Sequence, residues 1–220
     1  SVGGVVLIIV LLQAGVTVTL LDFLDTHYTP GGFGTPLHYL LDVREAVADS
    51  GAEDVIMIST EEQAPYDQEP AVWGVLLDDV PDVRFVDGTR TVVIPAGEAW
   101  ELIAVQSGLW TCAALECEGN GSETQVFDLR PGDPGRYMLR PVVDAWAGQI
   151  TPLEPVIFSN GAQLTGYGVL DAHVLLAFEL PGPIEVDVQA FVHVLDADGN
   201  RIGQWDRPAW PGRYWRAGDT

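Results

Sequence analysis

Lysine is absent from this sequence, and basic residues are scarce. Arginine supplies all 10 basic residues, against 32 aspartates and glutamates, so the formal net charge is −22 at pH 7. A surface this acidic repels the phosphate backbone of nucleic acids and anionic lipid headgroups, and nucleic acid is therefore not expected as a partner. A salt-adapted host would explain the excess of acid, whereas a GC-rich genome that prefers arginine explains the missing lysine equally well.

Cysteine and histidine are also rare. The two cysteines, Cys112 and Cys117, have no histidine nearby that would complete a zinc site. Their close spacing, in a body outside the cytoplasm, predicts a local disulfide, with two free thiols as the alternative. The sequence contains neither H-E-x-x-H nor G-x-S-x-G, so zinc-peptidase chemistry and a hydrolase nucleophile elbow are unsupported. We therefore assign no catalytic residue and no cofactor.

One long apolar run dominates the N-terminal end. Val2–Leu21 carries no charge, and only three of its residues are polar. A helix of this length spans about 30 Å, roughly the hydrocarbon core of a bilayer. We predict a transmembrane helix over residues 1–24 and a linker over residues 25–34, with a buried core helix as the alternative.

The flanks of this run are unlike those of a signal peptide. No initiator methionine, basic leader or cleavage site accompanies it. We expect the chain to be a fragment of a longer membrane protein whose earlier spans are missing. The first basic residue is Arg44, so the positive-inside rule alone gives little orientation.

Residues 35–149 are predicted to form a small α/β lobe. Thr35–Pro36 supplies an N-cap and a first helical proline, and Ser50–Gly51 supplies a stop, which together predict a helix. Val55–Ile58 is a continuous apolar run, as expected of a strand that is covered on both faces. A second helix is predicted over Gln68–Leu77. Alternation of helices and strands favours the α/β lobe.

The second half of the lobe is predicted from turn signals. Asp87–Gly88 lies between Val83–Val86 and Thr91–Ile94, a pattern typical of two strands joined by a tight turn. Gly97–Gln106 is predicted to be a third helix. Two further strands are predicted on either side of Pro131–Gly135.

Residues 150–220 have the pattern of an antiparallel β-sandwich, with short apolar runs separated by glycine, proline and aspartate. A complete sandwich usually needs about seven strands, so we expect this one to be incomplete at the C-terminus. The predicted fold class is therefore α+β, with a transmembrane helix, an α/β lobe and a truncated sandwich. The expected strands are Pro155–Phe158, Gln163–Leu170, His173–Leu180, Val186–Leu195 and Arg201–Asp206.

Two stretches carry a resemblance to a known family, NGAQLTGYGV (Asn160–Val169) and FVHVLDADGNRIGQWDRPAWPGRYWRAGD (Phe191–Asp219). They resemble the C-terminal extracytoplasmic region of large bacterial membrane proteins related to dolichyl-phosphate-mannose–protein mannosyltransferases. The upstream stretches TPGGFGTPL, DQEPAVWGVL and FDLRPGDPGRYMLRP are similar to the segment that joins the last span of these proteins to the sandwich. Val194 and Arg207 depart mildly from the family pattern.

The resemblance implies transfer of a sugar from a polyprenyl-phosphate donor. In that family the catalytic acid lies in an upstream loop with no counterpart here. This chain would then be the non-catalytic, extracytoplasmic tail that docks the acceptor or covers the active site. Its expected partners are membrane lipid and a glycan or a polyprenyl-phosphate sugar. The alternative is a membrane-anchored carbohydrate-binding or cell-envelope structural module without transferase activity.

An aromatic cluster near the C-terminus is the candidate ligand site. It consists of Trp205, Trp210, Tyr214 and Trp215, with Arg213 among them. Aromatic faces stack on sugar rings and arginine binds phosphate, so the cluster predicts a glycan or lipid-phosphate contact. The alternative is that the rings cover the end of the sandwich.

Asp196, Asp198 and Asn200 imitate the first ligands of a calcium loop. An EF-hand would require glycine and glutamate where Arg201 and Arg207 stand. We therefore expect a hairpin turn here, with calcium binding as a weak candidate.

Overall fold

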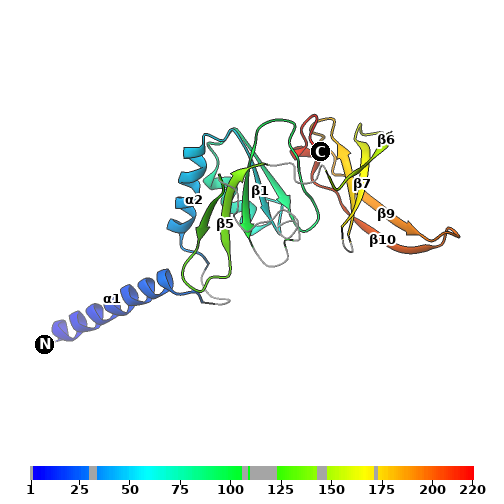
Figure 1. Ribbon diagram of the computed structural model, residues 1–220. Helices are drawn as coiled ribbons and strands as arrows, with labels where there is room; N and C mark the ends of the chain where they lie inside the picture. Colours follow the sequence, from blue (N-terminus) through cyan, green and yellow to red (C-terminus); the bar gives the residue numbers. More distant parts are fainter. Residues whose placement is uncertain (1, 30–33, 106–108, 110–122, 143–147, 171–172) are drawn as a thin grey trace.

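The chain has an α+β fold with one long apolar helix at its N-terminal end, as predicted (Figure 1). The computed structural model describes residues 2–29, 34–105, 109, 123–142, 148–170 and 173–220. Its elements are α1 (Val2–Thr26), α2 (Leu37–Ser50), β1 (Asp54–Ser59), α3 (Gln68–Leu76), β2 (Asp82–Asp87), β3 (Trp100–Val105), β4 (Gln125–Asp128), β5 (Arg136–Pro141), β6 (Thr151–Ile157), β7 (Gln163–Leu170), β8 (His173–Glu179), β9 (Gln189–Leu195), β10 (Arg201–Pro208) and a short 3-10 helix, η1 (Gly212–Tyr214).

Helix α1 projects away from the rest of the molecule (Figure 1). None of its 25 residues is buried by protein. It is the one helix in the described part of the chain that is long and apolar enough to cross a membrane. Exposed valine, leucine and isoleucine side chains of this density are stable only where lipid or another apolar surface covers them.

The lobe is built on a five-stranded mixed sheet with the order β2-β1-β3-β5-β4. Strand β1 runs parallel to β2 and β3, whereas β5 runs antiparallel to β3 and β4. Helix α3 connects β1 to β2 and lies against β1, and α2 lies against β5. Val55, Ile56, Met57 and Ile58 are all buried, which explains why this strand is apolar at successive positions.

Helix α2 confirms the predicted stop but not the predicted start. Gly51 adopts a left-handed conformation with a φ of 68° and donates its backbone N–H to Ala48. At the other end Pro36 occupies the N-cap position and no side chain caps the helix. The predicted role of Thr35 as the N-cap is therefore wrong. Pro36 was predicted at the first helical position, but the helix begins one residue later, at Leu37.

The predicted helix over Gly97–Gln106 is wrong, since Trp100–Val105 forms strand β3 between β1 and β5. The i,i+3 spacing of Trp100 and Ile103 favours a helix, on which Glu101 would face solvent. Glu101 is instead buried in the sheet, where its carboxylate lies 2.8 Å from the guanidinium Nε of Arg140. A buried charge is tolerated in a strand only when such a partner is present.

The hairpin predicted around Asp87–Gly88 is also wrong. Strand β2 pairs with β1, and residues 91–94 do not form a strand. The Asp87 carboxylate accepts hydrogen bonds from the backbone N–H and hydroxyl of Thr89, so the turn signal is real but local. Ile94 forms two backbone hydrogen bonds with Thr220 instead.

The C-terminal part contains the expected antiparallel strands, arranged as a three-stranded sheet, β6-β7-β8, and the two-stranded hairpin β9-β10. Gly166 and Gly168 of β7 face the start of β6. A Cβ atom on Gly166 would lie 2.9 Å from the carbonyl oxygen of Thr151, and one on Gly168 would collide with the carbonyl oxygen of Gln149. The glycines of the NGAQLTGYGV stretch are therefore required for this close approach.

The last eleven residues leave the hairpin and return to the lobe (Figure 1). We call this segment, Trp210–Thr220, the C-terminal clasp. Asp219 accepts a backbone hydrogen bond from Leu180, and Gly218 donates one to Leu180, so the clasp also contacts the chain directly after β8. The clasp thus joins the lobe to the C-terminal strands.

Candidate functional site

Three of the predicted ligand-binding rings lie in the C-terminal clasp and are buried against the lobe. Trp210, Tyr214 and Trp215 are 6%, 9% and 5% exposed. The indole N–H of Trp210 donates to the backbone oxygen of Phe85 in β2 at 2.8 Å, and that of Trp215 donates to the backbone oxygen of Trp210 at 2.9 Å. The indole N–H groups of both tryptophans therefore have hydrogen-bond acceptors inside the protein.

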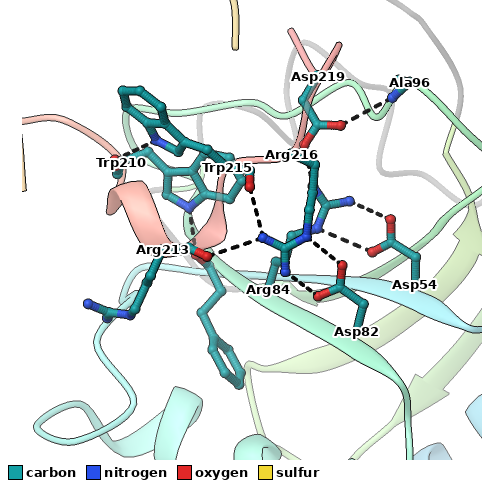
Figure 2. A network of polar contacts seen from close by, with 10 residues as sticks. Asp54, Asp82, Arg84, Ala96, Trp210, Arg213, Trp215, Arg216 and Asp219 are labelled. Atoms are coloured by element: carbon teal, nitrogen blue, oxygen red, sulfur yellow. Dashed lines mark hydrogen bonds and ion pairs between the residues drawn. The ribbon is translucent and has the colours of Figure 1, made fainter. Parts of the chain in front are cut away.

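A buried arginine anchors the clasp to the sheet (Figure 2). Arg84 of β2 is 0% exposed and makes two hydrogen bonds to the carboxylate of Asp54, at 3.2 and 2.5 Å. Its remaining amino group forms an ion pair with Asp219, whose other carboxylate oxygen accepts from the backbone N–H of Ala96 at 3.2 Å. Burial raises the pKa of Asp54, and the neighbouring Arg84 only partly offsets this effect.

Arg216, an arginine of the clasp itself, binds the beginning of strand β2. Arg216 makes two hydrogen bonds to the carboxylate of Asp82, at 2.8 and 2.5 Å, the bidentate geometry that guanidinium favours. The same side chain donates to the backbone oxygens of Arg213 and Trp215. Figure 2 shows Arg84 and Arg216 side by side, each facing its own aspartate of the lobe. The Arg84–Asp219 and Arg216–Asp82 pairs hold the clasp along strand β2.

Two of the five predicted ligand-binding residues remain accessible. Trp205 of β10 is 40% exposed and lies opposite Val192 of β9. Arg213 is exposed, and its guanidinium lies over the Tyr214 ring at 4.6 Å from the centroid. The structure thus divides the predicted cluster between the protein interior and the surface, and the ligand contact remains a prediction for the exposed members.

The weak calcium candidate lies in the β9-β10 turn. One oxygen of the Asp196 carboxylate accepts from the backbone N–H groups of Asp198 and Asn200, and the other accepts from the Asn200 side chain. These hydrogen bonds lower the pKa of Asp196. Within the residues that the structure describes, no three histidine, cysteine, aspartate or glutamate side chains are grouped to hold a metal ion. Calcium binding here stays a prediction, while the expected turn is present. Cys112 and Cys117 lie outside the described residues.

The junction between α1 and the lobe is the second place where polar contacts concentrate. Arg130, just after β4, donates to the backbone oxygen of Leu24 at 2.8 Å, and its guanidinium lies over the ring of Tyr28. The Tyr39 hydroxyl donates to the backbone oxygen of Asp25 at 3.3 Å. Carbonyl oxygens in the last turn of a helix lack helical partners, so these donors stabilise the end of α1 against the lobe.

A buried carboxyl, Glu62, and a half-buried one, Glu69, lie at the end of the lobe where β1 and β2 finish. The Tyr137 hydroxyl donates to Glu69 at 2.8 Å, and Arg90 forms an ion pair with Glu62. Burial is the largest cause that raises the pKa of Glu69 and of Glu62, and burial together with the nearby Glu69 raises the pKa of Tyr137. Tyr137 contacts Glu69 and Arg90 contacts Glu62, and structural pairs of this kind shift pKa values as active sites do. We therefore assign these groups no catalytic role.

The ion pairs that hold the clasp, Arg84–Asp219 and Arg216–Asp82, escaped the sequence analysis. One signal was available, since Arg84 is the one charged residue within the run Val83–Val86, and a charge in a buried strand needs a partner. The identity of that partner is not encoded locally, because Asp219 lies 135 positions away.

Comparison with known proteins identifies no relative. No protein-family model, no curated protein and no solved structure matches this chain. A functional assignment therefore depends on the sequence motifs and on the geometry described above.

Proposed function

We propose that this chain is the last membrane span and the non-catalytic extracytoplasmic domain of a glycosyltransferase that uses a polyprenyl-phosphate sugar. Helix α1 is the observation that carries the proposal, because its apolar side chains have no protein cover. The motifs around Asn160–Val169 and Phe191–Asp219 supply the enzyme class by resemblance. The body's role is to dock the acceptor or to cover the active site.

The charge pattern at the end of α1 supports an extracytoplasmic body. Residues 22–43 contain no lysine or arginine, and Asp22 and Asp25 lie in the last turns of the helix. Cytoplasmic flanks of spans are typically enriched in lysine and arginine, so this flank fits the opposite side. The contacts of Arg130 with Leu24 and Tyr28 then keep the lobe close to the membrane surface, where polyprenyl-phosphate sugars are presented.

The clasp supports a rigid covering or docking domain. By holding the hairpin half of the body on the lobe, it fixes the position of the exposed strands relative to α1. Three rings of the aromatic cluster are buried and cannot contact a sugar. Within the cluster, Trp205 and Arg213 are exposed and would make any such contact.

A second candidate function is a membrane-anchored carbohydrate-binding module without transferase activity. The specific observation in its favour is the Trp205 ring on β10, which is 40% exposed and presents an aromatic face on which a sugar ring can stack. It differs from the first function because it requires no polyprenyl-phosphate chemistry.

The discriminating experiment measures sugar transfer in membranes of the source organism with and without the gene that encodes this chain. We expect membranes lacking it to lose transfer from a radiolabelled polyprenyl-phosphate sugar, and a plasmid copy to restore it. Unchanged transfer, together with retention of the chain on a glycan column that depends on Trp205, would establish the second candidate instead.

Sidedness has its own test. Alkaline phosphatase fused after Thr220 is active only outside the cytoplasm, and we expect the fusion protein to show phosphatase activity.

Two arginine substitutions test the insertion of α1 itself. Leu12→Arg in the middle of α1 should prevent insertion, since arginine at a span centre costs about 2.5–3.5 kcal/mol, whereas the matched control Thr26→Arg at the helix end should be tolerated. An inactive fusion with an inserted helix would contradict the extracytoplasmic placement.

A further inference from the structure

A groove lies where α1 meets the lobe. Val18, Leu21 and Asp22 form part of its helix wall, and Pro36 and Arg130 belong to the wall that the lobe contributes. Asp25 lines the groove as well. The lining therefore changes along the helix from apolar side chains to charged ones over about two turns.

This change in polarity matches the depth of a lipid interface. The uncharged run of α1 ends at Leu21, so a bilayer that covers the run places Asp22 at its polar boundary. Val18 and Leu21 then lie at the level of the acyl chains, and Asp25 lies at the level of the headgroups. A lipid in the groove would contact both kinds of lining at once.

The accessible charge in the groove is negative. Asp22 is exposed, and the Asp25 side chain is 47% exposed and lies 3.3 Å from the imidazole of His38. Arg130 is the one basic side chain among the lining residues, but its side chain is only 2% exposed and is engaged with the end of α1. The groove therefore attracts the positive end of a zwitterionic headgroup and repels a headgroup with a net negative charge.

We infer that this groove binds a phospholipid with a primary-amine headgroup, of the phosphatidylethanolamine type. The ammonium group would donate hydrogen bonds to the carboxylates of Asp22 and Asp25, while an acyl chain lies along Val18 and Leu21. A choline headgroup has the charge but no N–H donor, and a glycerol headgroup leaves the lipid anionic. The inference rests on the proposed membrane placement of α1.

The test reconstitutes the full chain into nanodiscs of equimolar phosphatidylethanolamine, phosphatidylcholine and phosphatidylglycerol, and identifies the lipids that remain bound by native mass spectrometry. We expect phosphatidylethanolamine to be enriched about fivefold over phosphatidylglycerol, as one favourable charge contact at a membrane surface implies. The double variant Asp22→Asn/Asp25→Asn should abolish the enrichment. The matched control Asp42→Asn/Asp49→Asn removes the same charge from α2, outside the groove, and should keep it.

The outcomes separate the two proposals. Failure of the chain to enter nanodiscs overturns both the membrane placement and the lipid site. Entry into nanodiscs with equal binding of the three lipids, or with enrichment that survives in the Asp22→Asn/Asp25→Asn variant, overturns the lipid site alone. Equal retention of phosphatidylcholine and phosphatidylethanolamine contradicts the hydrogen-bonded amine.

Discussion

Arg84 of β2 and Asp219 of the C-terminal clasp lie 135 positions apart in the sequence and form an ion pair in the protein interior. Both side chains are almost completely shielded from water, at 0% and 2% exposure. A pair of this kind contributes little compared with apolar packing, but removing one partner leaves the other charge buried and uncompensated. The pair therefore makes the attachment of the clasp sensitive to single substitutions.

Asp219→Ala should lower the free energy of unfolding by about 3–5 kcal/mol, because Arg84 would then keep only Asp54 as a carboxylate partner. The measurement is urea unfolding of the full chain in detergent, followed by tryptophan fluorescence. Asp198→Ala removes an exposed carboxylate from the β9-β10 turn and should change stability by no more than about 0.5 kcal/mol. Equal effects of the two substitutions would contradict the buried pair.

Glu69 should make stability fall as pH rises. Burial raises its pKa above the ordinary value of 4.5, although the hydrogen bond from Tyr137 acts in the opposite direction. A carboxyl whose pKa is higher in the folded chain contributes stability that is fully present below its unfolded pKa and is lost as pH rises through the folded one. Glu69→Gln stays uncharged and can still accept from Tyr137, so its Tm should decline less than that of the native chain between about pH 4 and pH 8.

The control for this prediction is Glu154→Gln, which removes one carboxyl from the exposed strand β6. Thermal unfolding is followed at each pH for the native chain and both variants. Parallel Tm curves for the native chain and the Glu69→Gln variant would show that Glu69 does not titrate in the expected window.

Gly212→Ala should destabilise the clasp by about 1–3 kcal/mol, the usual cost of overpacking. A Cβ atom at this position would collide with the Ile184 side chain and lie 2.9 Å from its carbonyl oxygen. Gly97 is the matched control, since a Cβ there meets nothing within 4 Å. Thermal unfolding compares the two variants, and a Gly212→Ala variant as stable as Gly97→Ala would refute the tight contact.

The tryptophans of the predicted ligand cluster should separate into two classes. Trp210→Ala should cost about 3–5 kcal/mol of stability, because it empties a buried site and leaves the Phe85 carbonyl without its indole donor. Trp205→Ala should cost about 1 kcal/mol or less, since its ring is partly exposed on a hairpin. Urea unfolding distinguishes the two, and comparable losses would mean that Trp205 is also a packing residue.

Much of the secondary structure followed from local patterns. The limits of α3 and the left-handed stop of α2 at Gly51 were predictable, because helix ends depend on residues within one turn. The strands from β6 to β10 were predictable from alternation and turn residues. Strand β3 was not, because Glu101 imitates a solvent-facing helix position until its partner Arg140 is known.

The candidate site was predictable only in composition. The aromatic and arginine residues near the C-terminus were recognised, but their orientation was not, since Trp210 and Tyr214 contact Phe85, more than one hundred residues earlier in the chain. The fate of such a side chain depends on whether another segment covers it, and alternation along its own segment carries no information on that point.

The sequence by itself determined the apolar length of α1, the acidic character of the body and the α+β class, because each depends on composition and on contacts between neighbours in the chain. The tertiary structure alone decided that Trp210–Thr220 closes over β2, that Arg84 meets Asp219, and that Arg130 holds the end of α1. These contacts join distant segments, and their partners are chosen by burial of charge and shape at a surface that exists only after the lobe has folded.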